Sequence, residues 1–296
     1  MRLRDEIRVT FSGKDHLLVL LIINLSVFLV YSMSNLAMFL TGFGGGRQII
    51  EYVGMPSHLD SLLSRPWTLF TYMFVHFDFF HILFNLLVLF WTGRILSDQL
   101  SQKKVTATYI LGGLFGGVAF FLITNLIPAL QSASGPTYLI GASAGVLSIM
   151  VASAMVAPEY PVHLLLFGEI KLKYVAIGLV VLYLISIPNG NSGGHIAHLG
   201  GALAGFSYIK LLRSGVNMGG WIEYLLGLPQ KLSANRKIKV VHSNKQTTRV
   251  HSKSDNADQQ AVIDSILDKI SRSGYDSLSK SEKETLFKMS DENRNN

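Results

Sequence analysis

Apolar residues in this sequence gather into six long runs that contain few charged side chains. At about 1.5 Å per residue, a helix of roughly 20 apolar residues crosses the hydrocarbon core of a bilayer. The runs therefore predict an all-α membrane protein. The expected transmembrane helices are Leu17–Leu40, Phe79–Leu96, Val105–Ile127, Tyr138–Val156, Leu172–Ile187 and His195–Leu212.

Lysine and arginine are distributed unevenly between the connections. They flank the start of the first run, the end of the second, the start of the fifth and the end of the sixth, whereas segments 125–137 and 188–194 contain no charged residue. Cationic loops stay on the cytoplasmic side, so we expect both termini there. The first run is too long for a signal-peptide core, and we expect it to be a retained helix.

The same pattern divides the chain into four parts. We expect a cytoplasmic segment at 1–16, the helical domain at 17–212, an interfacial and basic linker at 213–254, and a small cytoplasmic helical module at 255–296. Between Lys231 and Lys253 the linker contains seven cations and no acid, which is typical of a segment facing lipid headgroups. The module is too small to bury much core alone, so we expect it to bind a cytoplasmic partner.

Two further segments have recognisable patterns. Thr41–Phe77 mixes apolar and aromatic residues with glycine, proline and acids, which predicts a structured, partly embedded insertion with short helices. Near the end of the chain, Ser279 and Glu282 have the spacing of a capping box at the start of a helix.

Composition agrees with the membrane class: 49% of the residues are hydrophobic and only 15% are charged, against about a quarter charged in soluble domains. The chain has no cysteine, which excludes disulfides, thiolate metal sites and cysteine nucleophiles. The net charge of +7 comes from residues beside apolar runs and in one tail. Membrane topology explains that placement better than nucleic-acid binding does.

Polar residues inside a bilayer are costly, so each is a functional candidate. The segment Gly141–Gly145 matches the G-x-S-x-G nucleophile elbow. That elbow requires a preceding strand and an orienting acid, but a polar loop at 131–136 precedes it and no nearby span contains a carboxylate. A soluble-hydrolase arrangement is therefore not expected. Taken alone, such small residues more often serve close helix packing.

His198 is the candidate partner of Ser143. Gly201 and Gly205, four residues apart, give its helix a groove for close approach, and the helix runs parallel to the one that contains Ser143. We place both residues about one turn inside their helices, at a shared depth of roughly 6 Å. His198 could then act as a general base for the Ser143 hydroxyl, although a lone buried histidine is more often structural.

His81 and Asn85 lie one turn apart on one face of the second span, after a candidate N-cap at Asp78. With the Ser143 backbone N–H, their side chains could form an oxyanion hole, or they could simply bond neighbouring helices. The histidines could instead bind a metal ion. Neither an HExxH motif nor a convergent carboxylate accompanies them, so we expect no metal and no cofactor.

Together these motifs resemble the rhomboid intramembrane serine proteases. The resemblance is carried by H-x4-H-x3-N at His76–Asn85, G-x-S at Gly141–Ser143 and A-H-x-x-G at Ala197–Gly201. It implies a six-transmembrane-helix rhomboid bundle, here followed by the C-terminal module. It also implies roles: Ser143 as nucleophile, His198 as base, His81 and Asn85 with Ser143 as oxyanion donors, and His76, Gly141 and Gly201 in support.

The sequence departs from the family pattern at three places. Arg65-Pro66-Trp67 stands where the family has its Trp-Arg region, in altered order. Ala144 follows the serine where many members have glycine. Leu147 occupies a position where an aromatic ring often packs against the histidine. These departures affect the orientation of His198 more than the reacting groups.

The resemblance implies transmembrane protein substrates that reach the site past span five, in contact with membrane lipid, in a bacterial cytoplasmic membrane. A non-catalytic relative that binds membrane clients is the alternative, although such a protein would lack Ser143 or His198. A transporter is less consistent with the sequence, because the polar residues gather in the outer third of the membrane only.

Overall fold

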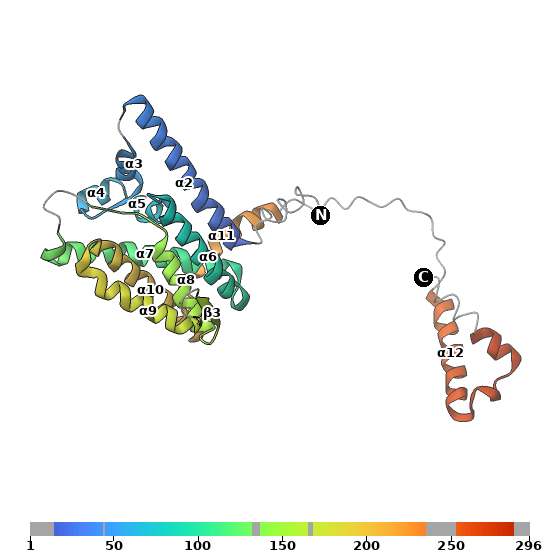
Figure 1. The fold of residues 1–296 in the computed structure, drawn as a ribbon. Coiled ribbons are helices and arrows are strands. Elements are labelled where there is room, and N and C mark those ends of the chain that lie inside the picture. Colours follow the sequence, from blue (N-terminus) through green and yellow to red (C-terminus); the bar gives the residue numbers. More distant parts are fainter. Residues whose placement is uncertain (1–14, 44, 132–136, 165–167, 235–252, 287–296) are drawn as a thin grey trace. The chain divides into compact units, whose positions relative to one another are not determined.

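The computed structural model describes residues 15–43, 45–131, 137–164, 168–234 and 253–286, which fall into two compact units, 1–235 and 236–296. The expected leader at 1–14 and the basic stretch at 235–252 lie outside these residues. The main helices of the first unit (Figure 1) are α2 (His16–Thr41), α6 (Phe79–Gln99), α7 (Gln102–Leu126), α8 (Ser143–Val156), α9 (Leu172–Ser186), α10 (Ser192–Arg213) and α11 (Gly220–Ala234).

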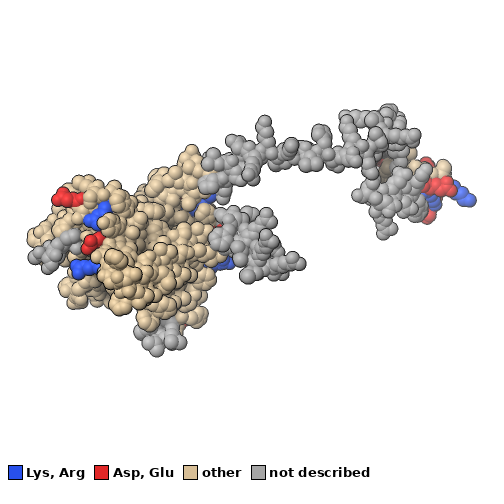
Figure 2. All heavy atoms as spheres, turned by 90° about the horizontal axis from the view of Figure 1, so that it is seen from above, with Lys and Arg blue, Asp and Glu red and all other residues tan. Residues whose placement is uncertain are grey.

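The chain is a membrane protein. Among the described residues, four helical segments are long and apolar enough to cross a bilayer, namely α2, α6, α7 and Leu172–Asn189, which joins α9 to the 3-10 helix η4 (Ile187–Asn189). The surface of the first unit in Figure 2 is correspondingly almost free of charged side chains. Helix α8 has only 14 residues, about 21 Å of rise, and α10 contains five glycines.

The expected start of the fourth span at Tyr138 is wrong. Tyr138–Leu139 form strand β2, which pairs antiparallel with strand β1 (Met55–Pro56), and α8 begins only at Ser143. Gly141 has φ +117°, a conformation that a helix does not accept. The apolar run is therefore divided between a strand, a turn and a short helix.

Glycines bring α7, α8 and α10 into backbone contact. A Cβ added to Gly201 would overlap the carbonyl of Ala144, and one added to Gly205 would overlap that of Ser148. The contact partner moves from Ala144 to Ser148 as the glycine moves from 201 to 205. Helices α8 and α10 therefore run in the same direction, as expected. Helix α7 runs antiparallel to α8, since its Gly112 approaches Ser148 while Gly116, one turn later, approaches Ala144. Close approach of this kind is the usual way in which helices associate in lipid.

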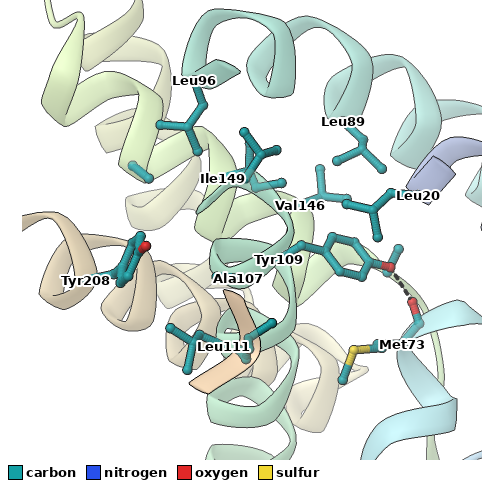
Figure 3. Packing of buried hydrophobic residues seen from close by; sticks show 14 of the residues in the cluster. Leu20, Met73, Leu89, Leu96, Ala107, Tyr109, Leu111, Val146, Ile149 and Tyr208 are labelled. Atoms are coloured by element: carbon teal, nitrogen blue, oxygen red, sulfur yellow. Dashed lines mark hydrogen bonds between the residues drawn. The ribbon is translucent and has the colours of Figure 1, made fainter. Parts of the chain in front are cut away.

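The core between these helices contains large apolar side chains and a few satisfied polar groups (Figure 3). Leu89, Val146 and Ile149 pack at its centre. The Tyr109 hydroxyl donates to the carbonyl of Met73 at 2.7 Å. This bond ties α7 to the segment that leads into α6.

The insertion at 41–77 contains short helices, as expected: α3 (Gly46–Val53), α4 (Leu59–Ser64), α5 (Thr68–Thr71) and the 3-10 helix η2 (Tyr72–Phe74). Three side chains donate to the last three carbonyls of α3, which lack partners within that helix. They are Arg65 to Glu51 O, Trp67 to Tyr52 O at 2.8 Å, and Thr71 to Val53 O at 2.7 Å. The Arg65-Pro66-Trp67 element therefore holds the insertion together.

A hairpin that the sequence analysis missed joins α8 to α9. Strands β3 (Pro161–Leu164) and β4 (Gly168–Lys171) pair antiparallel. Beside them, Glu159 accepts hydrogen bonds from Lys171 and Lys173, which lowers the pKa of this carboxyl to about 2. These bonds tie the foot of α9 to the end of α8.

The second unit contains α12 (Lys253–Ser273), the 3-10 helix η5 (Tyr275–Ser277) and a helix at 280–286. The reciprocal bonds of a capping box form as expected: Ser279 N–H donates to Glu282 Oε2 at 2.7 Å, and Glu282 N–H donates to Ser279 Oγ at 3.4 Å. Lys269 also pairs with Glu282 at 2.9 Å. These bonds join the two helices across the turn.

Candidate active site

Ser143 is the first residue of α8, at the end of a strand–turn–helix segment. The sequence analysis expected no strand before this serine. A two-residue strand is present, so the local path of the chain resembles that of a nucleophile elbow. The first described hydrogen bond of α8 is from Val146 N–H to Ala142 O. Within the described residues, the Ser143 N–H therefore has no acceptor and is available to a ligand.

The turn before Ser143 is held by the insertion. Gly141 N–H donates to Tyr72 O at 3.0 Å, and Ala142 N–H donates to Nε2 of His76 at 3.4 Å. His76 is fully buried, so its contact with the turn is shielded from water. A supporting role for His76 is consistent with this placement.

The structure brings His198 directly to Ser143. Nε2 of His198 lies 2.6 Å from Oγ of Ser143. One turn after His198, Gly201 lets the backbone of α10 contact that of α8 at Ala144, the residue next to Ser143. The expectation that both residues lie one turn inside their helices was wrong. Ser143 opens α8, while His198 is the seventh residue of α10.

Tyr183 of α9 completes the surroundings of His198, and sequence reasoning missed it. The centroids of the two rings are 4.2 Å apart, with an interplanar angle of 53°. His198 Nδ1 is buried and has no hydrogen-bond partner among the described residues. Two features of the sequence could have indicated this contact. Tyr183 lies in an otherwise aliphatic stretch of α9, and Leu147 of α8 supplies no aromatic ring for His198.

His81 and Asn85 lie on the opposite side of Ser143, in the first two turns of α6. Asp78 caps this helix by accepting from His81 N–H at 2.9 Å, as expected. Asn85 Nδ2 donates to His81 O at 2.8 Å, so one of its two N–H groups is used within its own helix. A Cβ on Gly141 would lie 2.8 Å from the His81 ring and 3.7 Å from Ser143 Oγ. The absence of a side chain at Gly141 leaves space between these two groups.

A cavity of about 490 Å³ opens over these side chains. Helices α6, α8, α9 and α10 line it with both polar and apolar side chains. The polar or reactive lining residues are Asp78, His81, Asn85, Ser143, Tyr183 and His198, and the apolar ones include Phe84, Leu147 and Leu179.

The histidines form two separate pairs. The ring centroids of His76 and His81 are 5.0 Å apart, and those of His195 and His198 are 6.2 Å apart. In the described part of the chain, no three His, Cys, Asp or Glu side chains gather closely enough to hold a metal ion. What the cavity offers instead is a hydroxyl with a base beside it and donors across from it.

Comparison with known proteins gives two family matches. Residues 63–215 match the Rhomboid domain family. Residues 252–292, which include α12, match a family of unknown function, DUF6576. The first match contains every residue of the cavity described above.

Curated relatives are similar over the same region. The chain is 30% identical over 202 residues to "RHOMBOID-like protein 12, mitochondrial" of Arabidopsis thaliana, covering 64% of this chain and 56% of the relative. It is 26% identical over 158 residues to "Rhomboid-like protease 1" of Toxoplasma gondii, covering 52% and 50%. The chain thus spans about half the length of the curated relatives that it matches.

Proposed function

The chain belongs to the rhomboid family, and on this premise we propose that it is an intramembrane serine endopeptidase that hydrolyses peptide bonds of other membrane proteins. The observation that carries the proposal is the 2.6 Å separation of His198 Nε2 from Ser143 Oγ. A hydroxyl and a base within hydrogen-bond reach, in a cavity, are the elements of an activated nucleophile.

In the first step, Ser143 Oγ attacks the carbonyl carbon of the scissile bond while His198 Nε2 takes the hydroxyl proton. This assigns the other ring proton to Nδ1, the nitrogen without a partner among the described residues. The C–N bond then breaks, and His198 returns the proton to the leaving amine. The pair works as a dyad, since no acid among the described residues binds Nδ1.

The negative charge that develops on the carbonyl oxygen needs donors fixed in advance. Three groups can supply them: the Ser143 N–H at the start of α8, the His81 ring, and the free N–H of Asn85. The start of α8 also carries the positive end of the helix dipole. The space in front of Gly141, between His81 and Ser143 Oγ, is where we place the substrate carbonyl.

In the second half of the reaction, a water molecule attacks the acyl-enzyme and its proton passes to His198. The Ser143–acyl bond then breaks, His198 returns the proton to Ser143 Oγ, and the new carboxylic acid leaves. Water therefore has to reach Ser143, and the polar side chains that line the cavity can bind it. A substrate helix must unwind locally beside the cavity, because a peptide bond inside an intact apolar helix is hidden from the nucleophile.

The proposal includes a topology. We propose that α2, α6, α7, α8, α9 and α10 form a six-helix bundle in the membrane, with both ends of the chain in the cytoplasm and with α12 in a module that binds a cytoplasmic partner. The short α8 fits this arrangement because its start, Ser143, would lie within the membrane. A bacterial cytoplasmic membrane stays a prediction, and the Arabidopsis relative is named as a mitochondrial protein.

The test is cleavage of a purified single-span substrate by purified protein in detergent and in liposomes. We expect Ser143→Ala and His198→Ala to fold like the wild type and to show no cleavage. Ser192→Ala, at the start of α10 and outside the cavity, serves as the matched serine control and should stay active. Equal cleavage by wild type and Ser143→Ala would contradict the mechanism. Client binding without cleavage by the wild type would favour the non-catalytic alternative.

A further inference from the structure

His198, the proposed general base, has no carboxylate bound to its ring among the described residues. In a Ser-His-Asp triad, a carboxylate bound to Nδ1 fixes the orientation and tautomer of the imidazole. Here Nδ1 of His198 is buried without a hydrogen-bond partner among the described residues. The ring can still turn about its side-chain bonds unless a packing contact prevents it.

The aromatic ring that contacts His198 belongs to α9. The Tyr183 centroid lies 4.2 Å from that of His198 and 5.8 Å from that of His195, within the range in which aromatic pairs attract each other. On α8, the residue one turn after Ser143 is Leu147, which is buried and lines the same cavity. That helix therefore contributes no ring at the corresponding place.

We infer that Tyr183 is the positioning residue of this site, holding the His198 imidazole with Nε2 toward Ser143 in place of an acid or of a ring from α8. The inference rests on the proposed function. It assigns the positioning role to the ring of Tyr183 and not to its hydroxyl, because the observed contact is between the two tilted rings. A base fixed by a neighbouring helix keeps the geometry that proton transfer requires, and small misplacements of reacting groups lower rates strongly.

Three substitutions separate this role from a general effect on folding. Tyr183→Phe keeps the ring, and we expect its kcat to stay within about twofold of the wild type, whereas Tyr183→Leu should lower kcat by about ten- to a hundredfold with a smaller change in KM. Tyr174→Leu is the matched control, because Tyr174 is an exposed tyrosine on the same helix and does not line the cavity. Its activity should not change.

A rescue variant sharpens the test. Leu147→Phe in the Tyr183→Leu background places a ring beside His198 from α8, in the space that the tyrosine has left. We expect the double variant to regain most of the lost kcat. If Tyr183→Leu changes only KM, or if its kcat equals that of the wild type, Tyr183 merely lines the cavity and the inference is wrong.

A measurement that needs no turnover completes the design. In protein with isotope-labelled histidine and Ser143→Ala, the Cε1–H resonance of His198, assigned by its loss in His198→Gln, should carry a ring-current shift. Tyr183→Leu should remove that shift and Tyr183→Phe should keep it. A shift that is the same in all three proteins would overturn the inference. Absence of Ser143-dependent cleavage in the wild type would instead refute the proposed function, while the resonance would still decide the contact.

Discussion

Two of the four helices that line the cavity form walls that are packed in different ways. One wall is α10, whose glycines let its backbone touch that of α8, as at Gly201 and Ala144. The other wall is α9, which meets its neighbours through side chains, and a Cβ added to its Gly178 would find nothing within 4 Å. In the segment Leu172–Asn189, which contains α9 and η4, 11% of the residues are buried, against 56% in the most apolar stretch of α7.

The contrast distinguishes helices that are held rigidly by backbone contacts from a helix that is held only by side chains. Helices in lipid lack a hydrophobic drive to associate, so close backbone packing decides which of them stay together. The reacting pair lies on the glycine-packed wall, where a shift would require backbones to separate. Helix α9, past which a substrate would enter under the proposed function, has fewer buried contacts that a displacement would break. We expect substitutions on the first wall to affect the chemistry most.

The largest effect should come from closing the glycine contact. Gly201→Ala places a methyl group against the carbonyl of Ala144, which should destabilise the fold by about 1–3 kcal/mol. The resulting shift of His198 should lower kcat about a hundredfold. Thermal unfolding in detergent and substrate cleavage measure the two effects.

Gly178→Ala on the opposite wall is the matched control for this change. It should leave cleavage unchanged and raise stability slightly, by less than about 1 kcal/mol, because alanine favours helix more than glycine does. Similar losses in both variants would mean that the two walls do not differ as described.

The next largest effect concerns the turn before Ser143. Gly141→Ala introduces a side chain at φ +117° and 2.8 Å from the His81 ring. We expect kcat to fall about a hundredfold through the displaced oxyanion donors. Gly215→Ala, at φ +83° in open space, imposes similar backbone strain away from the cavity. It should lose stability but keep its kcat, and an equal loss of activity would contradict this account of Gly141.

A smaller effect should follow from loosening the insertion behind the turn. Trp67→Phe keeps an aromatic ring but removes the N–H that donates to Tyr52 O. The loss of one such bond should lower the free energy of unfolding by about 1 kcal/mol, with a modest fall in activity. Trp91→Phe, at an exposed position on α6, should change neither quantity. Unfolding curves of the two variants, recorded side by side, give the comparison.

The smallest effect should come from the ion pairs of Glu159 at the start of α9. The Glu159 carboxyl has its pKa lowered from 4.5 to about 2 by its hydrogen bonds with Lys171 and Lys173. A carboxyl with a depressed pKa stabilises the fold fully above its ordinary value and loses that contribution as pH falls toward the folded value. Glu159→Gln should therefore lower Tm slightly at pH 7, and the difference should shrink as pH falls from 4.5 toward 2. A constant difference across that range would contradict the assignment.

Much of this architecture could be predicted because hydrophobic runs and glycine spacing act locally. The long helices α2, α6 and α7 follow directly from their apolar runs. The contact between α8 and α10 follows from Gly201 and Gly205, since only small residues let backbones meet. The capping roles of Asp78 and Ser279 also depend on near neighbours alone.

The remainder depends on residues that are distant in the sequence. The start of α8 could not be placed because Tyr138 pairs with Pro56, a choice that no local pattern encodes. The contact of Tyr183 with His198 was missed for the same reason, since it depends on how α9 turns against α10. Arg65 and Trp67 matched a family element in altered order, and only their acceptors on α3 gave them a physical role.

The short pairing of β1 with β2 has a consequence for the biogenesis of the protein. Ser57 and Thr137, which extend this pairing, are 80 residues apart, and contacts between such distant segments form late in folding. A chain emerging from the ribosome therefore inserts α6 and α7 before the turn at Gly141 can take its shape. If the proposed function is right, Ser143 gains its activity only after the surrounding helices are assembled, so an incompletely synthesised chain in the membrane has no proteolytic activity.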